Sequence, residues 1–218
     1  MYQSQNSLLL RQVQPQHQPQ LPRNQGQIIS PSSASHLSEA ATPTFASAPQ
    51  LKEIFIANDT DRNGLLDSSE LTLALLSLDS TQFDVSTAKL MIAIFDSDGN
   101  GSLQFREFAQ LWDFLCEWRR LFDFYDENSN GSISVVEFGK ALHSFGFDLR
   151  SSSYERLFHE FTGRVRKEMP FDIFVQACIR LRKLEGIYQR HERAASESLL
   201  MDLEMFLMLS FEIKGVLS

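Results

Sequence analysis

The sequence DTDRNGLLDSSE at residues 59–70 is the first of three closely similar twelve-residue segments in this 218-residue chain. Residues 96–107 read DSDGNGSLQFRE, and residues 126–137 read DENSNGSISVVE. Each segment has oxygen-bearing side chains at positions 1, 3 and 5, Gly at position 6, an aliphatic residue at position 8 and Glu at position 12. A fragment of this pattern is common in polar turns between helices, but three complete copies indicate one repeated structural unit.

The spacing of these oxygen atoms suits a calcium ion. Ca²⁺ takes about six to eight oxygen ligands, and a short loop must fold around the ion to supply them. Positions 1, 3, 5 and 12 offer side-chain oxygens, position 7 a backbone carbonyl, and position 9 a side chain that often acts through water. Gly at position 6 permits the left-handed turn that closes the loop. The pattern is that of the EF-hand loop, and it predicts three bound Ca²⁺ ions.

The candidate calcium ligands follow from these positions. They are Asp59, Asp61, Asn63, Leu65 (through its carbonyl), Asp67 and Glu70 in the first loop, Asp96, Asp98, Asn100, Ser102, Gln104 and Glu107 in the second, and Asp126, Asn128, Asn130, Ser132, Ser134 and Glu137 in the third. Four, three and two of them are carboxylates, respectively. Ligand charge alone therefore ranks the first loop as the tightest site.

Two further copies are found from the apolar frame of the repeat rather than from its ligands. The frame consists of an aromatic or aliphatic residue four positions before the loop and an aliphatic residue or Met at position 8, and it recurs at 162–173 and 192–203. The five loops then start 37, 30, 36 and 30 residues apart. This alternation predicts five related hands.

The last two loops lack the ligands. Lys167 stands where the fourth loop needs Gly, and Ile173 occupies its position 12. The fifth loop has Ala194 at position 3 and Leu203 at position 12. We expect both loops to be structural.

The two short spacings predict helices that are shared between neighbouring hands. No Gly or Pro lies between Glu107 and Asp126, so one helix should leave the second hand and enter the third. Residues 173–191 should connect the fourth and fifth hands in the same way, although Gly186 lowers the helical propensity of this segment.

The composition separates a tail from a domain. Residues 1–50 contain ten Gln, eight Ser and six of the seven Pro residues, so we expect them to be disordered and residues 51–218 to form the folded domain. The net charge of −8 argues against a nucleic-acid partner. Two cysteines are too few for a disulfide framework, and neither a secretory signal nor an apolar stretch of membrane-spanning length is evident. A cytosolic or nuclear location is therefore expected.

An enzymatic function has little support in the sequence. Cys116 and Cys178 lie in apolar helical segments, where buried thiols are more common than nucleophiles. The five histidines have no metal-site spacing. We expect no catalytic site.

The domain resembles the penta-EF-hand family over residues 51–218. Beyond the number and spacing of the hands, the resemblance rests on FAQLWDFLCEW at 108–118, KALHSFGF at 140–147 and FDIFVQAC at 171–178. It implies an all-α fold of five EF-hands with short paired loop strands. It also implies a cytoplasmic calcium sensor that dimerises through its fifth hand and engages a protein target or a membrane when calcium binds. Tails in the family are often rich in Gly, Pro, Tyr or Ala, so the Gln-rich tail of this chain carries no inherited role.

Five hands leave one loop strand without an intrachain partner. Position 8 of the first hand, Leu66, can pair with Leu103, and Ile133 can pair with Met169, which leaves Leu199 at an open edge. Pairing of two fifth hands would close the edge and give a homodimer, or a heterodimer with another penta-EF-hand chain. The interface would contain Leu199, Leu200, Met201, Leu203, Met205, Phe206, Leu207, Met208 and Phe211. Alternatively, this run belongs to the intrachain core.

These features predict a calcium sensor that exposes apolar surface to a protein target or a membrane when Ca²⁺ binds. Two other interpretations remain open at the level of sequence. The chain could be a passive calcium buffer or dimeric scaffold, or it could be the regulatory subunit of a calcium-dependent protease whose catalytic chain is separate.

Overall fold

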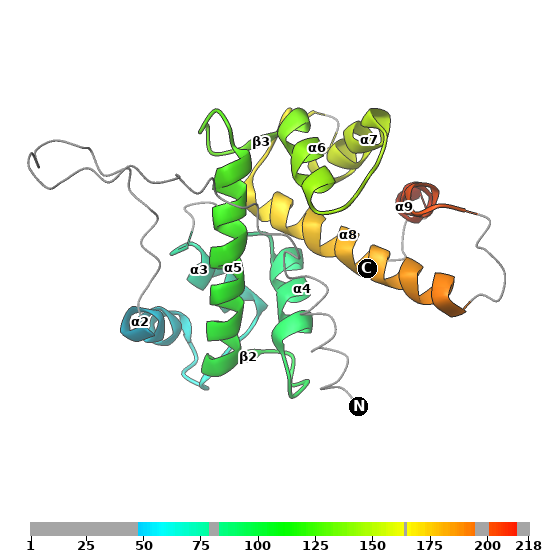
Figure 1. Ribbon diagram of the computed structural model, residues 1–218. Helices are drawn as coiled ribbons and strands as arrows, with labels where there is room; N and C mark the ends of the chain where they lie inside the picture. The colour runs from blue at the N-terminus through cyan, green and yellow to red at the C-terminus, as the bar shows by residue number, and fades with distance from the viewer. Residues whose placement is uncertain (1–47, 79–82, 164, 195–200, 213–218) are drawn as a thin grey trace, which may run out of the picture.

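A computed structural model describes residues 48–78, 83–163, 165–194 and 201–212. Within these ranges the chain forms eight helices and four two-residue strands (Figure 1). They are α2 (Ala48–Asn58), β1 (Leu65–Leu66), α3 (Ser68–Leu75), α4 (Val85–Phe95), β2 (Leu103–Gln104), α5 (Phe105–Tyr125), β3 (Ile133–Ser134), α6 (Val135–Ser144), α7 (Ser151–Thr162), β4 (Glu168–Met169), α8 (Phe171–Ala194) and α9 (Leu203–Glu212). The expectation of an all-α fold is confirmed.

The short strands join the loops in pairs. Leu66 lies opposite Leu103 in the antiparallel ladder β1–β2, and Ile133 lies opposite Met169 in β3–β4. Both predicted pairings at position 8 are therefore confirmed. Leu199, the predicted open edge, lies outside the described residues.

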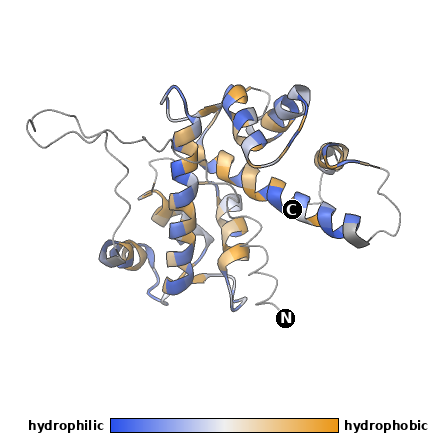
Figure 2. Ribbon diagram, in the orientation of Figure 1, coloured by the Kyte–Doolittle hydropathy of each residue, from blue (hydrophilic) through white to orange (hydrophobic). Residues whose placement is uncertain are grey.

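Two long helices connect the hands, as the sequence predicted. α5 is one uninterrupted helix of 21 residues, and α8 is one of 24 residues that contains Gly186. Glycine lowers helix stability by about 1 kcal/mol relative to alanine. The cost is offset here because the turns before it bury Leu181 and Leu184. In Figure 2 the first turns of α8 are mostly hydrophobic and its last turns mostly hydrophilic.

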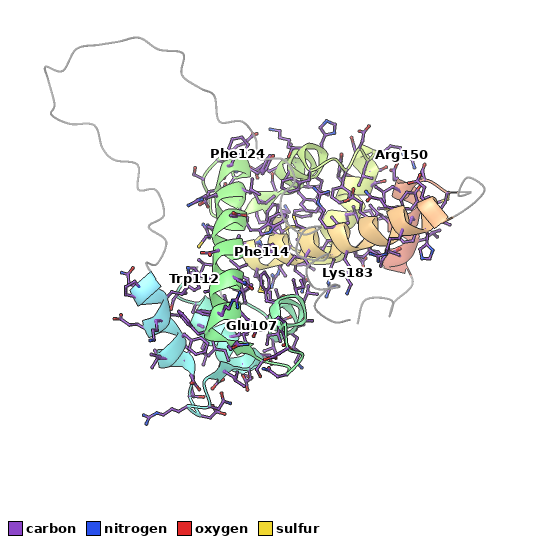
Figure 3. The ribbon with its side chains drawn as sticks, turned by 60° about the horizontal axis from the view of Figure 1, so that its bottom comes forward. Glu107, Trp112, Phe114, Phe124, Arg150 and Lys183 are labelled. Atoms are coloured by element: carbon purple, nitrogen blue, oxygen red, sulfur yellow. The ribbon has the colours of Figure 1, made fainter. Side chains whose placement is uncertain are left out.

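The core follows the inner faces of these two helices. Trp118 on α5 packs edge-on against Phe174 on α8, with their ring centroids 6.1 Å apart. Figure 3 shows Glu107 and Phe124 at opposite ends of α5, with Trp112 and Phe114 between them. Trp112, Phe114 and Trp118 are all buried, so these rings form core rather than a target groove.

Two boundaries differ from those predicted. α2 begins at Ala48, three residues inside the predicted tail, and residues 1–47 lie outside the described part of the chain. α8 continues to Ala194, so the first three residues of the predicted fifth loop are helical. The sequence His191-Glu-Arg-Ala194 consists largely of good helix formers and has no ligand set that would require a turn. Residues 195–200 are not among those described, and α9 starts at Leu203.

α9 packs back on the same chain. Leu207 is fully buried, and Phe206 lies 5.6 Å from Tyr188 and Phe211 lies 5.2 Å from Phe161 between ring centroids. Leu207 therefore belongs to the intrachain core, and its assignment to a dimer interface was wrong. Met205 and Leu209 remain 54% and 40% exposed, four residues apart on α9. Leu199 and Leu200 lie outside the described residues.

Candidate metal sites

The Asp at position 1 organises each of the three loops. Its Oδ2 accepts a hydrogen bond from the backbone N–H of the Gly at position 6, at 2.9 Å for Asp59, 2.8 Å for Asp96 and 2.7 Å for Asp126. Its Oδ1 accepts one from the backbone N–H of position 5 in every case. The glycines Gly64, Gly101 and Gly131 have φ values of 79°, 84° and 78°, a region that favours residues without a Cβ. These contacts fold the chain around a common centre.

The side chains at positions 3 and 5 continue the same arrangement. Oδ1 of Asp61, Asp98 and Asn128 accepts from the N–H of position 5 at 3.0, 3.1 and 3.0 Å. Oδ1 of Asn63, Asn100 and Asn130 then accepts from the N–H of position 7. The three loops thus share one backbone arrangement despite their different sequences.

The Glu at position 12 closes each loop. Glu70 Oε1 accepts from the Thr60 N–H at 2.8 Å and its Oε2 from the Asp67 N–H at 3.1 Å, so one carboxylate connects positions 2 and 9. Glu107 and Glu137 form the equivalent bonds. All three glutamate side chains are buried, and a buried carboxyl group needs partners such as hydrogen-bond donors or a cation.

The closing glutamates also begin the helices that leave the loops. Glu70 and Asp67 form a capping box at the start of α3, and Glu107 with Gln104 and Glu137 with Ser134 form the boxes of α5 and α6. Burial would raise the pKa of Glu70, but hydrogen bonds from Thr60 and Asp67 outweigh it and hold the pKa below its ordinary value of 4.5. For Glu137 the bonds from Ser134 and Glu127 have the same effect against burial. Both groups are therefore carboxylates at neutral pH.

The first two loops bring three carboxylates together. Oxygens of Asp59, Asp61 and Glu70 lie within 4.8 Å of one another, and so do those of Asp96, Asp98 and Glu107. Ligands about 2.4 Å from a single ion can be at most about 4.8 Å apart, so both clusters have the size of a calcium site. The chemistry of the donor set, all oxygen and mainly carboxylate, fits Ca²⁺.

The remaining candidates at positions 7 and 9 lie where the ladders join the loops. Leu65, with its carbonyl, and Gln104 face each other across β1–β2, and Gln104 Nε2 donates to Asp98 Oδ2 at 3.4 Å. Asp67 and Ser134 act as helix caps. Ser102 and Ser132 donate their backbone N–H to position 5.

Two residues of the loops were missed by the sequence reasoning. The hydroxyl groups of Thr60 and Ser97, both at position 2, donate to the closing glutamate at 2.7 and 2.5 Å. The sequence did contain a signal for these bonds, because a residue with a hydroxyl group follows the first Asp in both loops. The third loop has Glu127 there and uses its backbone N–H alone.

The fourth loop has no comparable arrangement among its described residues, 162–163 and 165–173. Thr162, at position 1, turns its hydroxyl back to the carbonyl of Phe158 at 2.8 Å and ends α7. Glu168 and Asp172 do not meet as a carboxylate cluster of metal-site size. This agrees with a structural role for the fourth hand.

The two cysteines are buried, as expected. Burial raises the pKa of the Cys116 thiol to about 12, and it raises that of Cys178 further. Thiols with such pKa values are protonated at neutral pH and are poor nucleophiles.

Among the described residues, no helix has the length and apolar character needed to cross a bilayer.

Comparisons with known proteins agree with this geometry. The family profile of the EF-hand domain pair matches residues 49–112, and that of the EF-hand domain matches residues 117–146. Human peflin is 29% identical over 159 residues, which is 72% of this chain and 56% of peflin. The match spans between 51% and 59% of the length of the four peflins compared.

Sorcin from Schistosoma japonicum is matched over nearly its whole length. It is 32% identical over 163 residues, which is 75% of this chain and 95% of that sorcin. A solved structure of a homolog of programmed cell death 6 protein from Leishmania major Friedlin superposes with a TM-score of 0.55 at 26% identity, covering 74% of this chain and 93% of that one. With three oxygen-lined loops, two paired ladders and these relatives, the chain belongs to the penta-EF-hand family of calcium-binding proteins.

Proposed function

We propose that the chain is a calcium sensor whose loops 59–70, 96–107 and 126–137 each bind one Ca²⁺ through the eighteen ligand residues named above. The observation that carries the proposal is that all three loops share one hydrogen-bond arrangement, with the position 12 glutamate folded over the loop. Bound Ca²⁺ would supply two positive charges at the centre of each carboxylate group. Affinities of about 10⁻⁷ to 10⁻⁵ M are typical of such sensor sites.

The test is a calcium titration of Glu70→Gln, Glu107→Gln and Glu137→Gln by calorimetry. Each variant should lose one of three calcium ions, because the amide removes the charge and one of the two coordinating oxygens. Glu127→Gln is the matched control, since Glu127 lies in the third loop but pairs with Lys140 at 2.5 Å. A stoichiometry that stays at three in a position 12 variant would remove that loop from the proposal.

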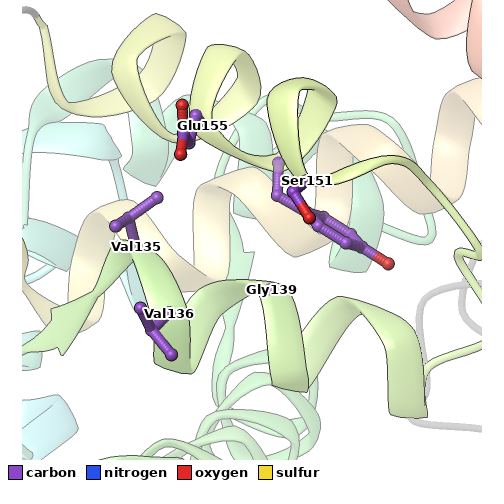
Figure 4. A pocket seen from close by; sticks show the side chains of 6 residues that line it. Val135, Val136, Gly139, Ser151 and Glu155 are labelled. Atoms are coloured by element: carbon purple, nitrogen blue, oxygen red, sulfur yellow. The ribbon is translucent and has the colours of Figure 1, made fainter.

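The proposed partner surface is a groove between α6 and α7. It has a volume of about 250 Å³ and is lined by Val135, Val136, Gly139, Ser151, Tyr154 and Glu155 (Figure 4). Val136 is 64% exposed at its edge. Val135 and Val136 form the first turn of α6, directly after the third loop, so a shift of α6 on ion binding would change the width of the groove. An apolar segment of a target protein fits this chemistry.

A dye-binding experiment separates the sensor from the buffer. Fluorescence of a hydrophobic dye should rise with calcium in the natural chain and should rise less in Val136→Asp. Val165→Asp is the control, because Val165 is 94% exposed on the fourth loop and is not among the residues that line the groove. No calcium-dependent rise in the natural chain would favour the buffer or dimeric scaffold.

We further propose a homodimer, or a heterodimer with another penta-EF-hand chain, through the fifth hand. Met205 and Leu209 support this, since they lie on the face of α9 that the core does not cover. Light scattering on the natural chain and on Met205→Glu/Leu209→Glu tests the proposal. The natural chain should have twice the mass of the variant, and a monomeric natural chain at micromolar concentration would overturn it.

We also propose that the chain is cytoplasmic and is recruited to membranes when the calcium concentration rises. Fractionation of cells with and without calcium, using the full chain and a chain that starts at residue 48, would measure this recruitment and the contribution of residues 1–47.

A further inference from the structure

The third loop has the fewest carboxylates of the three. Asp126 and Glu137 are its only candidate carboxylate ligands, and positions 3 and 5 carry the neutral Asn128 and Asn130. The one other acid of the loop, Glu127, is held by Lys140 Nζ at 2.5 and 2.7 Å. The loop itself therefore offers a cation less negative charge than its two neighbours do.

A carboxylate from the fourth hand lies beside this loop. Glu168 Oε2 accepts a hydrogen bond from the Ser132 hydroxyl at 2.8 Å, across 36 residues of sequence. The ladder brings it there, because Glu168 on β4 is the direct partner of Ser134 on β3. Directly paired residues point their side chains to the same face of a ladder. Ser134 is the candidate ligand at position 9, so Glu168 lies on the same face as that ligand.

The Ser132 hydroxyl connects Glu168 to another candidate ligand. Its Oγ lies 2.7 Å from Asn130 Oδ1, and the Ser132 backbone N–H donates to the same oxygen at 2.8 Å. A hydroxyl has one proton to donate. When that proton is held by Glu168, the second lone pair of Asn130 Oδ1 is left for a cation.

We propose that Glu168 is a positioning residue of the third calcium site, supplied by the ligand-poor fourth hand. It adds negative charge beside the loop and orients Ser132 so that Asn130 can coordinate the ion. The inference rests on the proposed calcium binding by residues 126–137. Arg166 and Lys167 directly precede Glu168 in the chain, so Glu168 is the acid that offsets their positive charge in this segment.

In the first pair of hands, no carboxylate stands at the position that is equivalent to Glu168. Glu168 is position 7 of the fourth loop, and the same position of the first loop is Leu65, which lies opposite Gln104. A leucine side chain adds no charge there. The second loop has three candidate carboxylates of its own and does not depend on a neighbour in this way.

Glu168→Gln tests the proposal, because it removes the charge but keeps the size and a carbonyl acceptor. Outer-shell partners of metal ligands typically change affinity by about 10- to 100-fold, and for this exposed side chain we expect about tenfold weaker binding at the third loop. The readout is the amide resonance of Gly131 during a calcium titration by NMR, because this N–H donates to Asp126 Oδ2 at 2.7 Å. Gly64 and Gly101 report on the other two loops, and their titrations should change much less than that of Gly131.

Three further variants keep the result interpretable. Glu160→Gln, an exposed acid on α7, should leave the Gly131 titration unchanged, and Glu168→Asp should recover part of the affinity. In a Ser132→Ala background, Glu168→Gln should have a smaller effect, because only the contribution of its charge remains once the hydrogen bond is gone. An identical Gly131 titration in the natural chain and Glu168→Gln would overturn the role of Glu168. A Gly131 resonance that never responds to calcium in the natural chain would instead overturn the third site.

Discussion

Gln176 Nε2 donates a hydrogen bond to the Thr87 hydroxyl at 2.8 Å, although 89 residues separate the two in the chain. Both residues are buried, Thr87 completely. Thr87 belongs to α4 of the second hand and Gln176 to α8 of the fourth, so this bond connects the two pairs of hands directly.

Thr87→Val should lower the free energy of unfolding by about 1–3 kcal/mol, because it leaves the buried amide of Gln176 without its partner. Chemical denaturation in the presence of a calcium chelator measures this change. Adding Gln176→Met to Thr87→Val should recover part of the loss, since the unpaired polar group is then gone. Lys89→Ala, at an exposed position of the same helix, is the control and should change stability by no more than about 0.5 kcal/mol. A Thr87→Val variant as stable as this control would show that the bond contributes nothing.

Glu107 should have separable roles in stability and in calcium binding. Without calcium, Glu107→Ala should lose about 1–2 kcal/mol of stability, because the N–H groups of Ser97 and Gln104 lose their acceptor and the capping box of α5 is broken. Glu107→Gln keeps one acceptor oxygen and should lose less. Both variants should lose calcium at the second loop. Thermal melts in chelator check the first statement, and equal melting temperatures for the two variants would contradict it.

Glu204 should make part of the stability pH-dependent. Its Oε1 accepts from the Ser153 hydroxyl and from Arg150 Nε at 3.0 Å, which attaches α9 to the start of α7. The bond from Ser153, followed by those from Arg150, holds the pKa of Glu204 below its ordinary value of 4.5. A depressed pKa stabilises the fold above pH 4.5, and this stabilisation is lost as the pH falls through the lower, folded-state value.

Melting temperatures between pH 7 and pH 3, in chelator, should therefore fall less steeply below pH 4.5 for Glu204→Gln than for the natural chain. Above that pH the two curves should run parallel, with the variant lower. Identical slopes in the acid range would rule out a contribution from this carboxylate.

Cys116 and Cys178 should be unreactive in the folded protein. Both are buried, and burial raises the pKa of Cys116 to about 12. A disulfide reagent that detects thiolates at pH 8 should report no fast-reacting thiol before denaturant is added and two afterwards. Rapid modification of either thiol in the native chain would mean that its helix opens.

The first three loops were predictable because their chemistry is local. Asp59, Asn63 and Glu70 lie within twelve residues, so their spacing can be recognised without knowing how the helices pack. The pairings of Leu66 with Leu103 and of Ile133 with Met169 followed from the same register. The ladders and the two shared helices could therefore be predicted from the sequence.

The contacts between hands could not be predicted in this way. Glu168 meets Ser132 across 36 residues, and Glu204 meets Arg150 across 54. Both contacts depend on how whole helices pack, which no local pattern encodes. The start of the fifth hand was misplaced for a related reason. Without a metal-binding pattern, helix propensity alone decides where α8 ends, and it carries the helix through Ala194.

The continuity of α5 has a thermodynamic consequence. Its first turn carries Glu107 of the second loop, and Asp126 of the third loop follows its last residue, so one rod about 30 Å long ends in two candidate calcium sites. Eleven of its residues are buried, and a rod held so firmly tilts as a unit. Free-energy coupling between two sites is reciprocal. If calcium at the second loop changes the affinity of the third by some factor, calcium at the third loop changes the affinity of the second by the same factor. The second and third loops are therefore linked through one helix, although they share no ligand.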